Sequence, residues 1–361
     1  MALISVSTYN FRNLENCTVN TDSPDIFLVG ENGQGKTNFL EAVYSLSFGN
    51  SFRTRYDSLL LKENEKELSV KGLYRDADSD ENSVFLTLVN GKKAIQLNGK
   101  RIKDRKEIIH NNPCIVFSHD DIYFVNGPPD RRRIFFNQTI SLFDLSFLDT
   151  LRRYEKILKN RNALLKENSS DLLEILDLQL AEEGLEIGKT RKKVIEEFNK
   201  TFSPVFKRVS GLDAGIRIIY RPSWNLDSSP ENIAKLLASK RNAEFAAGAT
   251  MSGPHRDGFF YYMDKKDFTK IASTGQTRLI SLSLRSAQAE FYKLKTGRKP
   301  LVLLDDVLLE LDKTRKIRFI DSFPEYEQAF YTFLPGEEEL MRGTHRDGIF
   351  YTVKNGVIRE Q

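Results

Sequence analysis

Residues 30–37 have the types and spacing of a phosphate-binding loop. Their sequence, GENGQGKT, fits G-x-x-x-x-G-K-[ST], in which backbone N–H groups surround phosphate oxygens. An apolar strand candidate precedes the loop, and apolar spacing that suits a helix follows it. In this arrangement Lys36 reaches the β- and γ-phosphates and the Thr37 hydroxyl ligates Mg²⁺. The pattern predicts ATP and Mg²⁺ as cofactors and these ATP-binding residues: Gly30, Glu31, Asn32, Gly33, Gln34, Gly35, Lys36 and Thr37.

Two adjacent acids follow an apolar run much later in the chain. The run at residues 301–304, LVLL, ends in Asp305 and Asp306, at the end of a predicted buried strand. We expect Asp305 to hold Mg²⁺ together with Thr37. We expect Asp306 to orient the attacking water as general base, with Lys36 as the other catalytic residue. The gap of about 270 residues between Thr37 and Asp305 suits an ATPase head that an insertion splits.

A Ser-Thr-Gly-Gln sequence opens a predicted helix about 30 residues before the two acids. Ser273, Gly275 and Gln276 place a hydroxyl and a backbone N–H at the start of this helix, where anions bind. An ordinary helix N-cap is the alternative interpretation. The sequence Glu-Leu-Asp, which ends at Asp312, follows the two acids.

Composition limits the class of protein. The 361 residues are 40% hydrophobic and 29% charged, with a net charge of +4. We expect no signal peptide and no membrane span. The two cysteines lie far apart without partners at ligand spacing, so we expect neither a disulfide framework nor a zinc site, and a cytoplasmic location. Basic residues cluster between 131 and 193, either as DNA contacts or as solvated helix faces, and the candidate DNA-binding residues are Arg131, Arg132, Arg133, Arg152 and Arg153.

Periodicity predicts an α/β protein with a helical insertion. The first 120 residues are rich in strand patterns, and from about residue 145 two antiparallel helices of about 20 and 30 residues follow, the second ending at Pro204. The last third returns to alternating strands and helices and closes with an Asn355-Gly356 hairpin. We expect an N-terminal head part at 1–125, a helical arm at 126–245 and a C-terminal head part at 246–361.

The order of these motifs resembles the ATP-binding-cassette heads of SMC-like DNA-maintenance proteins and, most closely, the RecF recombination-mediator family. The resemblance covers nearly the whole chain. Its most specific stretches are GPPDRRR at 127–133 and SGPHRD at 252–257. Further shared stretches are residues 11–13, 30–42, 51–54, 117–118, 120–121, 273–278, LLDD and ELD.

The resemblance implies a P-loop ABC-type ATPase head, a mixed sheet with helices, carrying an inserted helical arm domain. It also implies that Ser273, Gly275, Gln276 and the D-loop Asp312 act in trans on ATP bound to a partner, so that ATP forms a homodimer. Family members clamp double-stranded DNA near single-strand gaps and junctions and work with RecO and RecR to load recombinase. The resemblance thus implies a weak, DNA-stimulated ATPase of DNA repair, replication and the SOS response.

The chain departs from the family pattern in places. Thr277 stands where a second Gln is more typical, and Asp306 is shorter than the usual Glu, which favours slow hydrolysis. His255 and His345 lie in His-Arg-Asp sequences, but the other kinase motifs are missing. The role of either histidine stays open. Two alternatives also remain: an ATPase subunit that powers transport, and a P-loop kinase of small molecules.

Overall fold

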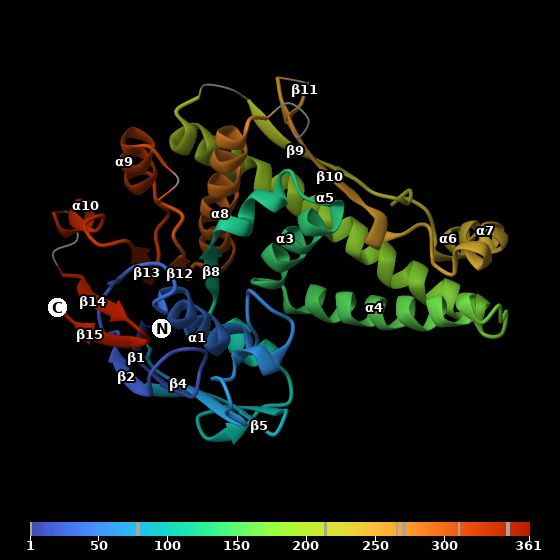
Figure 1. Ribbon diagram of the computed structural model, residues 1–361. Coiled ribbons are helices and arrows are strands. Elements are labelled where there is room, and N and C mark those ends of the chain that lie inside the picture. Colours follow the sequence, from blue (N-terminus) through green and yellow to red (C-terminus); the bar gives the residue numbers. More distant parts are fainter. Residues whose placement is uncertain are drawn as a thin grey trace. The chain divides into compact units, whose positions relative to one another are not determined.

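The structure is a computed structural model (Figure 1) that describes residues 2–76, 80–212, 215–264, 266–268, 272–309, 311–343 and 347–361. The chain forms two compact units. The first unit contains residues 1–119 and 288–361, and the second contains residues 120–287. Residues 246–287, which the sequence assigned to the head, belong to the second unit. The functional division into head and arm stays a prediction.

A mostly parallel sheet carries the loop at residues 30–37 in the first unit. Four of its strands, at residues 25–29, 114–117, 301–304 and 328–333, are buried on both faces, which explains why they appear in the sequence as mostly apolar runs. Strand β3 carries the loop, β12 carries the two acids, and β13 lies between them. The strand order is β15 (Val357–Glu360), β14 (Ile349–Lys354), β3 (Asp25–Val29), β13 (Gln328–Phe333), β12 (Leu301–Leu304) and β8 (Cys114–Phe117), with only β15 antiparallel to its neighbour.

An antiparallel sheet forms the other layer of the first unit. Its strands alternate buried and exposed side chains, so one face packs on the core and the other faces solvent. The predicted Asn90-Gly91 and Asn98-Gly99 turns are confirmed, since all four residues have positive φ. The strand order is β2 (Cys17–Asn20), β1 (Ala2–Tyr9), β4 (Glu67–Arg75), β5 (Glu81–Val89), β6 (Lys92–Leu97) and β7 (Lys100–Arg101).

Helix α1 (Lys36–Phe48) lies between these sheets. It contacts β4 and β5 on one side and β8 and β13 on the other. Phe39, Leu40 and Val43 of α1 are fully buried, so the helix that follows the phosphate-binding loop is part of the core. The shorter helices of this unit are η1 (Asp57–Leu60), α2 (Lys106–Asn111), α9 (Lys313–Asp321) and α10 (Glu339–Arg342).

The second unit contains the two long helices that the sequence predicted. Helices α4 (Leu145–Lys166) and α5 (Leu173–Ser210) pack along each other (Figure 1). Helix α8 (Thr274–Thr296) begins in this unit and ends in the first. The other elements are η2 (His119–Phe124), α3 (Pro129–Ser141), β9 (Ile216–Arg221), α6 (Pro230–Ser239), α7 (Arg241–Ala247), η3 (Pro254–Arg256), β10 (Gly258–Met263) and β11 (Lys266–Asp267).

The prediction that Pro204 ends the second long helix is wrong. Helix α5 continues through Pro204 to Ser210 and ends at Gly211, which has the left-handed φ of 70° common at helix ends. Val205 and Phe206, directly after the proline, are buried. Their packing outweighs the hydrogen bond that proline removes.

A buried charge network joins α4, α5 and α7. The Arg161 side chain is 0% exposed and donates through Nε to Asp177 Oδ1 at 2.6 Å. Its Nη2 lies 2.7 Å from Glu244 Oε2, and its Nη1 donates to Thr250 at 2.8 Å. Such a network specifies how the helices meet, because each charge out of water needs its partner.

We expect Arg161→Ala to lower the free energy of unfolding of the second unit by about 3–5 kcal/mol, because Glu244 would stay buried without its cation and Asp177 would keep only Arg241. Urea unfolding followed by circular dichroism measures this change. Lys159→Ala, at an exposed position of α4, is the control and should change stability by less than about 0.5 kcal/mol. Equal effects of the two substitutions would contradict the assigned role.

Candidate nucleotide site

The loop at residues 30–37 joins β3 to α1, as its sequence predicts. Gly33 and Gly35 have φ of 78° and 116°, which side chains other than glycine rarely adopt. Gly35 is also the N-cap of α1, so the loop ends at a helix N-terminus, where the positive end of the helix dipole favours an anion.

The loop borders a cavity of about 220 Å³ in the first unit. Lys36 lies almost fully buried at its wall and donates through Nζ to the backbone carbonyls of Gly30 and Glu31. The cavity brings together most of the predicted loop residues, the predicted base and Arg53. It is lined by Glu31, Asn32, Gly33, Gly35, Lys36, Thr37, Asn38, Arg53 and Asp306.

Thr37 and Asp305 lie side by side, as the sequence predicts. The Thr37 hydroxyl donates to Asp305 Oδ1 at 2.6 Å. Burial, with a smaller contribution from nearby Asp306, raises the pKa of Asp305 to about 6, against the lowering effect of the Thr37 hydrogen bond. A buried carboxylate beside a hydroxyl suits a hard cation such as Mg²⁺. No group of three or more His, Cys, Asp or Glu side chains among the described residues could hold a metal, so the remaining ligands would be water and phosphate oxygens.

Thr332 of β13 fixes Asp306. The Asp306 backbone N–H donates to the Thr332 hydroxyl at 2.8 Å, and Asp306 Oδ1 lies 2.8 Å from the same hydroxyl. Asp306 has a φ of 52°, a left-handed conformation that Asp and Asn tolerate better than most residues. This arrangement directs the carboxylate to the cavity wall, where a general base is needed.

Glu41 is a residue of the site that the motif search missed. Its carboxylate is fully buried on α1 and accepts two hydrogen bonds from Arg12, each of 2.8 Å, and one from Ser51. Arg53 Nη1 lies 3.6 Å from Glu41 and donates to Asn38 Oδ1 at 2.9 Å. Glu41 therefore holds both arginines near the loop. The only signal in the sequence was an acid on an otherwise apolar helix face.

The C-terminal hairpin supports the loop from its other side. The backbone N–H of Gly356 donates to Gln34 O at 2.9 Å, and that of Asn355 donates to Gln34 Oε1 at 2.7 Å. A Cβ atom on Gly356 would lie 1.9 Å from the Asn13 carbonyl oxygen, so only glycine fits there. The predicted hairpin turn is confirmed, and it also fixes the side chain of Gln34.

The Ser-Thr-Gly-Gln sequence forms the N-terminus of α8. The Ser273 hydroxyl accepts a hydrogen bond from the backbone N–H of Gln276, and the backbone N–H of Ser273 donates to the side-chain oxygen of Gln276. This reciprocal pair is a capping box. Ser273, Gly275 and Gln276 are exposed. Asp312 is exposed as well and caps α9 by accepting from the Arg315 backbone at 2.9 Å. The proposed roles of these residues in trans stay predictions.

The five candidate DNA-binding arginines differ in their surroundings. Arg131 is exposed, whereas Arg132 donates to Val125 O at 2.9 Å and Arg133 donates to Asp257 O at 3.0 Å. Arg152 lies 3.8 Å from Asp149, and Arg153 forms a two-pronged pair with Glu183. Four of these five arginines therefore already interact with carbonyl or carboxylate oxygens inside the second unit.

The SGPHRD stretch belongs to a buried polar network in the second unit. His255 Nε2 donates to Thr250 O at 3.1 Å, so its Nδ1 accepts from the Tyr154 hydroxyl at 2.6 Å. Asp257 accepts from Arg191 Nη1 at 2.8 Å. These contacts explain the His-Arg-Asp sequence at 255–257 without kinase chemistry. His345 lies outside the described residues.

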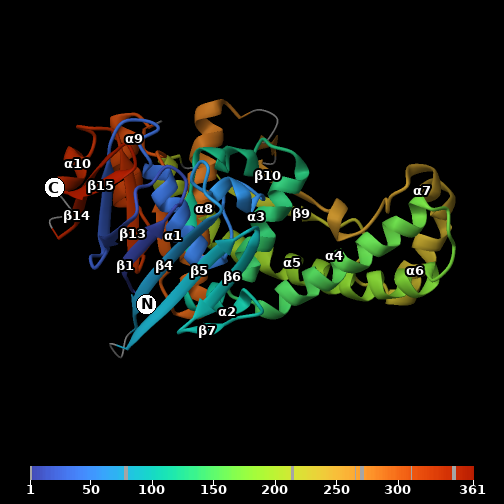
Figure 2. The same cartoon turned by 60° about the horizontal axis from the view of Figure 1, so that its bottom comes forward.

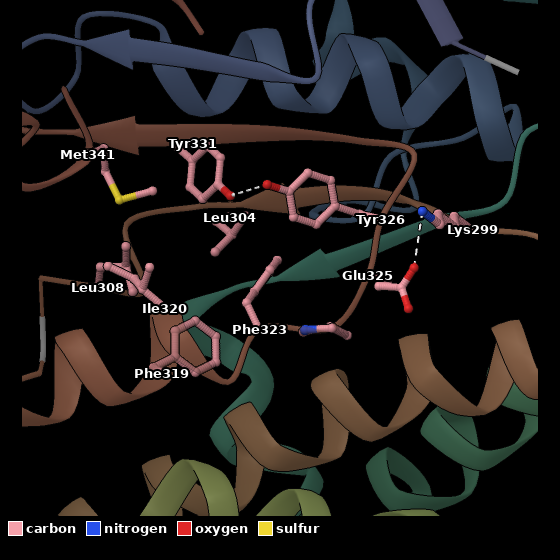
Figure 3. A pocket seen from close by; sticks show the side chains of 11 residues that line it. Lys299, Leu304, Leu308, Phe319, Ile320, Phe323, Glu325, Tyr326, Tyr331 and Met341 are labelled. Carbon is pink, nitrogen blue, oxygen red and sulfur yellow. Dashed lines mark hydrogen bonds and ion pairs between the residues drawn. The ribbon is translucent and has the colours of Figure 1, made fainter. Parts of the chain in front are cut away.

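A further cavity of about 370 Å³ lies beside α9 and β12 (Figure 3). Leu304, Phe319 and Met341 give it an apolar wall. The Tyr326 hydroxyl donates to Asp25 at 2.7 Å and lies 3.4 Å from the Tyr331 hydroxyl. Its tyrosine hydroxyls thus have partners within the protein, and the predicted catalytic residues Lys36 and Asp306 line the nucleotide cavity instead.

Comparisons with known proteins agree with this geometry. The family model "RecF/RecN/SMC N terminal domain" matches residues 2–349. The DNA replication and repair protein RecF of Treponema pallidum is 42% identical over 357 residues, covering 98% of this chain and 100% of the relative. RecF of Leptospira interrogans is 35% identical over 336 residues, covering 92% and 91%.

Solved structures give the same result for the fold. A structure of the recombination mediator protein RecF with ATP in the RecFOR pathway has a TM-score of 0.89 and 31% identity, covering 100% of this chain and 97% of that one. An SMC head bound to the C-terminal winged-helix domain of ScpA has a TM-score of 0.60 and 18% identity, with coverage of 100% and 97%. The predicted fold class, an SMC-like and RecF-like head of mixed α/β structure, is confirmed.

Burial lowers the pKa of His255 to about 4, and neighbouring arginines contribute to the lowering. Between about pH 6.5 and pH 4 the unfolded chain binds a proton at His255 that the folded chain does not. We therefore expect the free energy of unfolding to fall by about 2 kcal/mol from pH 7 to pH 5 on account of this residue. His255→Gln keeps a donor for Thr250 O, and it should reduce the pH dependence by that amount. An identical pH dependence of the variant and the parent would contradict the assignment.

Proposed function

The chain belongs to the RecF family, and on this premise we propose that it is an ATP-dependent DNA-binding protein of recombinational DNA repair and replication restart. The observation that carries the proposal is the cavity at which Lys36, Thr37 and Asp306 meet, with Asp305 bonded to Thr37. Relatives of the same fold have been solved with ATP, which supports ATP as the ligand.

The residues around the cavity have separate roles in ATP hydrolysis. Loop N–H groups and Lys36 bind the phosphates, and Thr37 and Asp305 hold Mg²⁺, which neutralises charge on the phosphates when bound. Asp306 accepts a proton from the attacking water, and Thr332 keeps its carboxylate in place. The short side chain of Asp306 favours slow hydrolysis that acts as a switch.

A second copy of the chain completes the site in this proposal. Ser273, Gly275 and Gln276 lie exposed at a helix N-terminus, where they are available to the γ-phosphate of ATP on a partner. Asp312, the proposed D-loop residue, is also exposed. ATP then favours the dimer, and hydrolysis removes the contact and releases it.

Double-stranded DNA near gaps and single-strand junctions is the proposed ligand of the dimer. Arg131 is exposed, and Arg152 and Arg153 lie on α4 where they can contact phosphates in addition to their own acids. RecO and RecR are the proposed partners, supported by relatives solved as members of the RecFOR pathway. We place this activity in the cytoplasm. None of the described helices is long and apolar enough to span a bilayer.

The proposed functional division remains an ATPase head at 1–125 and 246–361 with an arm at 126–245. Residues 246–287 pack within the second unit, but they lead to the α8 N-terminus that carries Ser273. Assigning them to the head therefore follows from the proposed role of Ser273 in ATP binding.

The shared site is tested by light scattering with a non-hydrolysable ATP analogue. We expect the parent to dimerise, and both Ser273→Arg and Lys36→Ala to stay monomeric alone, since each lacks one half of both sites. An equimolar mixture of the two variants should recover dimers, because one complete site forms in each mixed pair. Asn160→Arg, at an exposed position of α4, is a control for added charge. Failure of the mixture to dimerise, or dimers of Ser273→Arg alone, would reject the shared site.

Asp306→Asn tests the assigned base. Asparagine tolerates the left-handed backbone of this position and keeps an oxygen for Thr332, so we expect ATP binding to stay within about threefold of the parent. Steady-state ATP hydrolysis should fall by about 100-fold or more, and ATP-bound dimers should persist on duplex DNA. Dissociation of this variant from DNA at the rate of the parent would mean that Asp306 is not the base.

A further inference from the structure

One edge of the antiparallel sheet carries a concentration of positive charge that lies outside the motifs above. Residues 92–106 contain seven basic residues and one acid, a net charge of +6, whereas the whole chain carries +4. They form β6, β7 and the start of α2, which lie together at this edge (Figure 2). We use the name basic edge for Lys92, Lys100, Arg101 and Lys103.

The local structure holds the basic edge in a fixed position. The Asn98-Gly99 turn pairs Leu97 with Lys100 and Gln96 with Arg101. On the opposite side, Ile95 is buried, and Ile102 packs against the core of the first unit. The cations therefore project from an anchored hairpin, and their backbone loses little entropy when a ligand binds.

No acidic side chain among the described residues forms an ion pair with the basic edge. Lys93 pairs with Asp57 at 2.7 Å, and Lys106 lies 3.7 Å from Asp104. By contrast, the basic-edge side chains are exposed and have no hydrogen bond or ion pair within the described part of the chain. Several unpaired like charges repel one another, and a polyanion that binds them removes this repulsion.

The length of the edge matches a nucleic-acid backbone. Lys92 and the turn lie at opposite ends of β6, which at about 3.3 Å per residue puts them roughly 17 Å apart. Successive phosphates on one strand of DNA are about 3.4 Å apart along the axis, so this length covers about five of them. Flexible cations on a sheet edge contact phosphates but do not enter a groove as a helix does, so they carry no base specificity.

We propose that the basic edge is a binding site for the phosphate backbone of double-stranded DNA, independent of base sequence and additional to the candidate arginines of the second unit. This inference rests on the proposed function, which supplies duplex DNA as the polyanion. A purely protective role, in which lysines keep the exposed edge strand β7 from pairing with another sheet, is the competing explanation.

The test compares two double variants of the full-length chain. Lys100→Gln with Arg101→Gln removes two charges beside the Asn98-Gly99 turn. Lys66→Gln with Lys71→Gln removes two exposed charges, directly before β4 and in its middle, within the same sheet, and is the control. Binding to a fluorescent duplex is measured by anisotropy, with a non-hydrolysable ATP analogue, between roughly 50 and 200 mM salt.

We expect the basic-edge variant to bind about tenfold more weakly, and the slope of log affinity against log salt to become shallower by about 1.8, since each lost phosphate contact removes about 0.9. The control should keep the slope of the parent, and both variants should keep its unfolding temperature. A basic-edge variant with the parent's slope, or a control with the same loss, overturns the inference.

Two further outcomes separate the possible failures. If the parent itself does not bind duplex DNA, the proposed function fails before the basic edge is tested. Vesicles of anionic phospholipid are the second probe. If the basic-edge variant loses binding to these vesicles while its DNA binding equals that of the parent, the surface recognises a membrane, and the inference is wrong.

Discussion

The buried contact between Glu41 and Arg12 is the constraint on which the nucleotide site depends. A carboxylate without access to water is tolerated only when its oxygens are fully bonded, and here Arg12 and Ser51 supply those bonds. The pair fixes α1 against the chain near the N-terminus, in addition to the apolar packing between the two sheets. Lys36 and Thr37 occupy the first turn of this fixed helix. Their positions relative to Asp305 and Asp306 are therefore set by the core.

The parts of the site that the sequence predicts are those whose partners are close in sequence or whose pattern is continuous. The loop at 30–37 lies between a strand and a helix, and the apolar run before Asp305 becomes a buried strand, as expected. Parallel strands β3, β13 and β12 then bring their C-terminal ends to one edge, so Thr37 meets Asp305 across 268 residues of sequence. The two motifs alone therefore predict that Thr37 and Asp305 lie together, and the sheet explains how they do so.

The supporting residues could not be predicted because their partners are distant in sequence. Thr332 acts on Asp306 from a neighbouring strand, and nothing in its own surroundings marks it. The same holds for Pro204, where local propensity favours a helix end and the burial of the following residues favours continuation. At His255 the kinase-like sequence, which lacks the other kinase motifs, serves packing and hydrogen bonding. In each case the tertiary contacts outweigh the local signal.

The first unit places its nucleotide cavity and its basic edge at opposite ends of α1. The helix has 13 residues and is about 20 Å long. At its C-cap, Gly49, the side chains of Ile95 and Arg105 lie so close that a Cβ atom would not fit. Its N-terminus faces the cavity, while its C-terminus abuts the segment that carries the basic edge. The hydrogen bonds of Glu41 to Arg12 and Ser51 oppose a sliding movement of α1 within the unit. In the proposed ATP-dependent dimer, nucleotide and DNA would then be coupled by the first unit moving as one body.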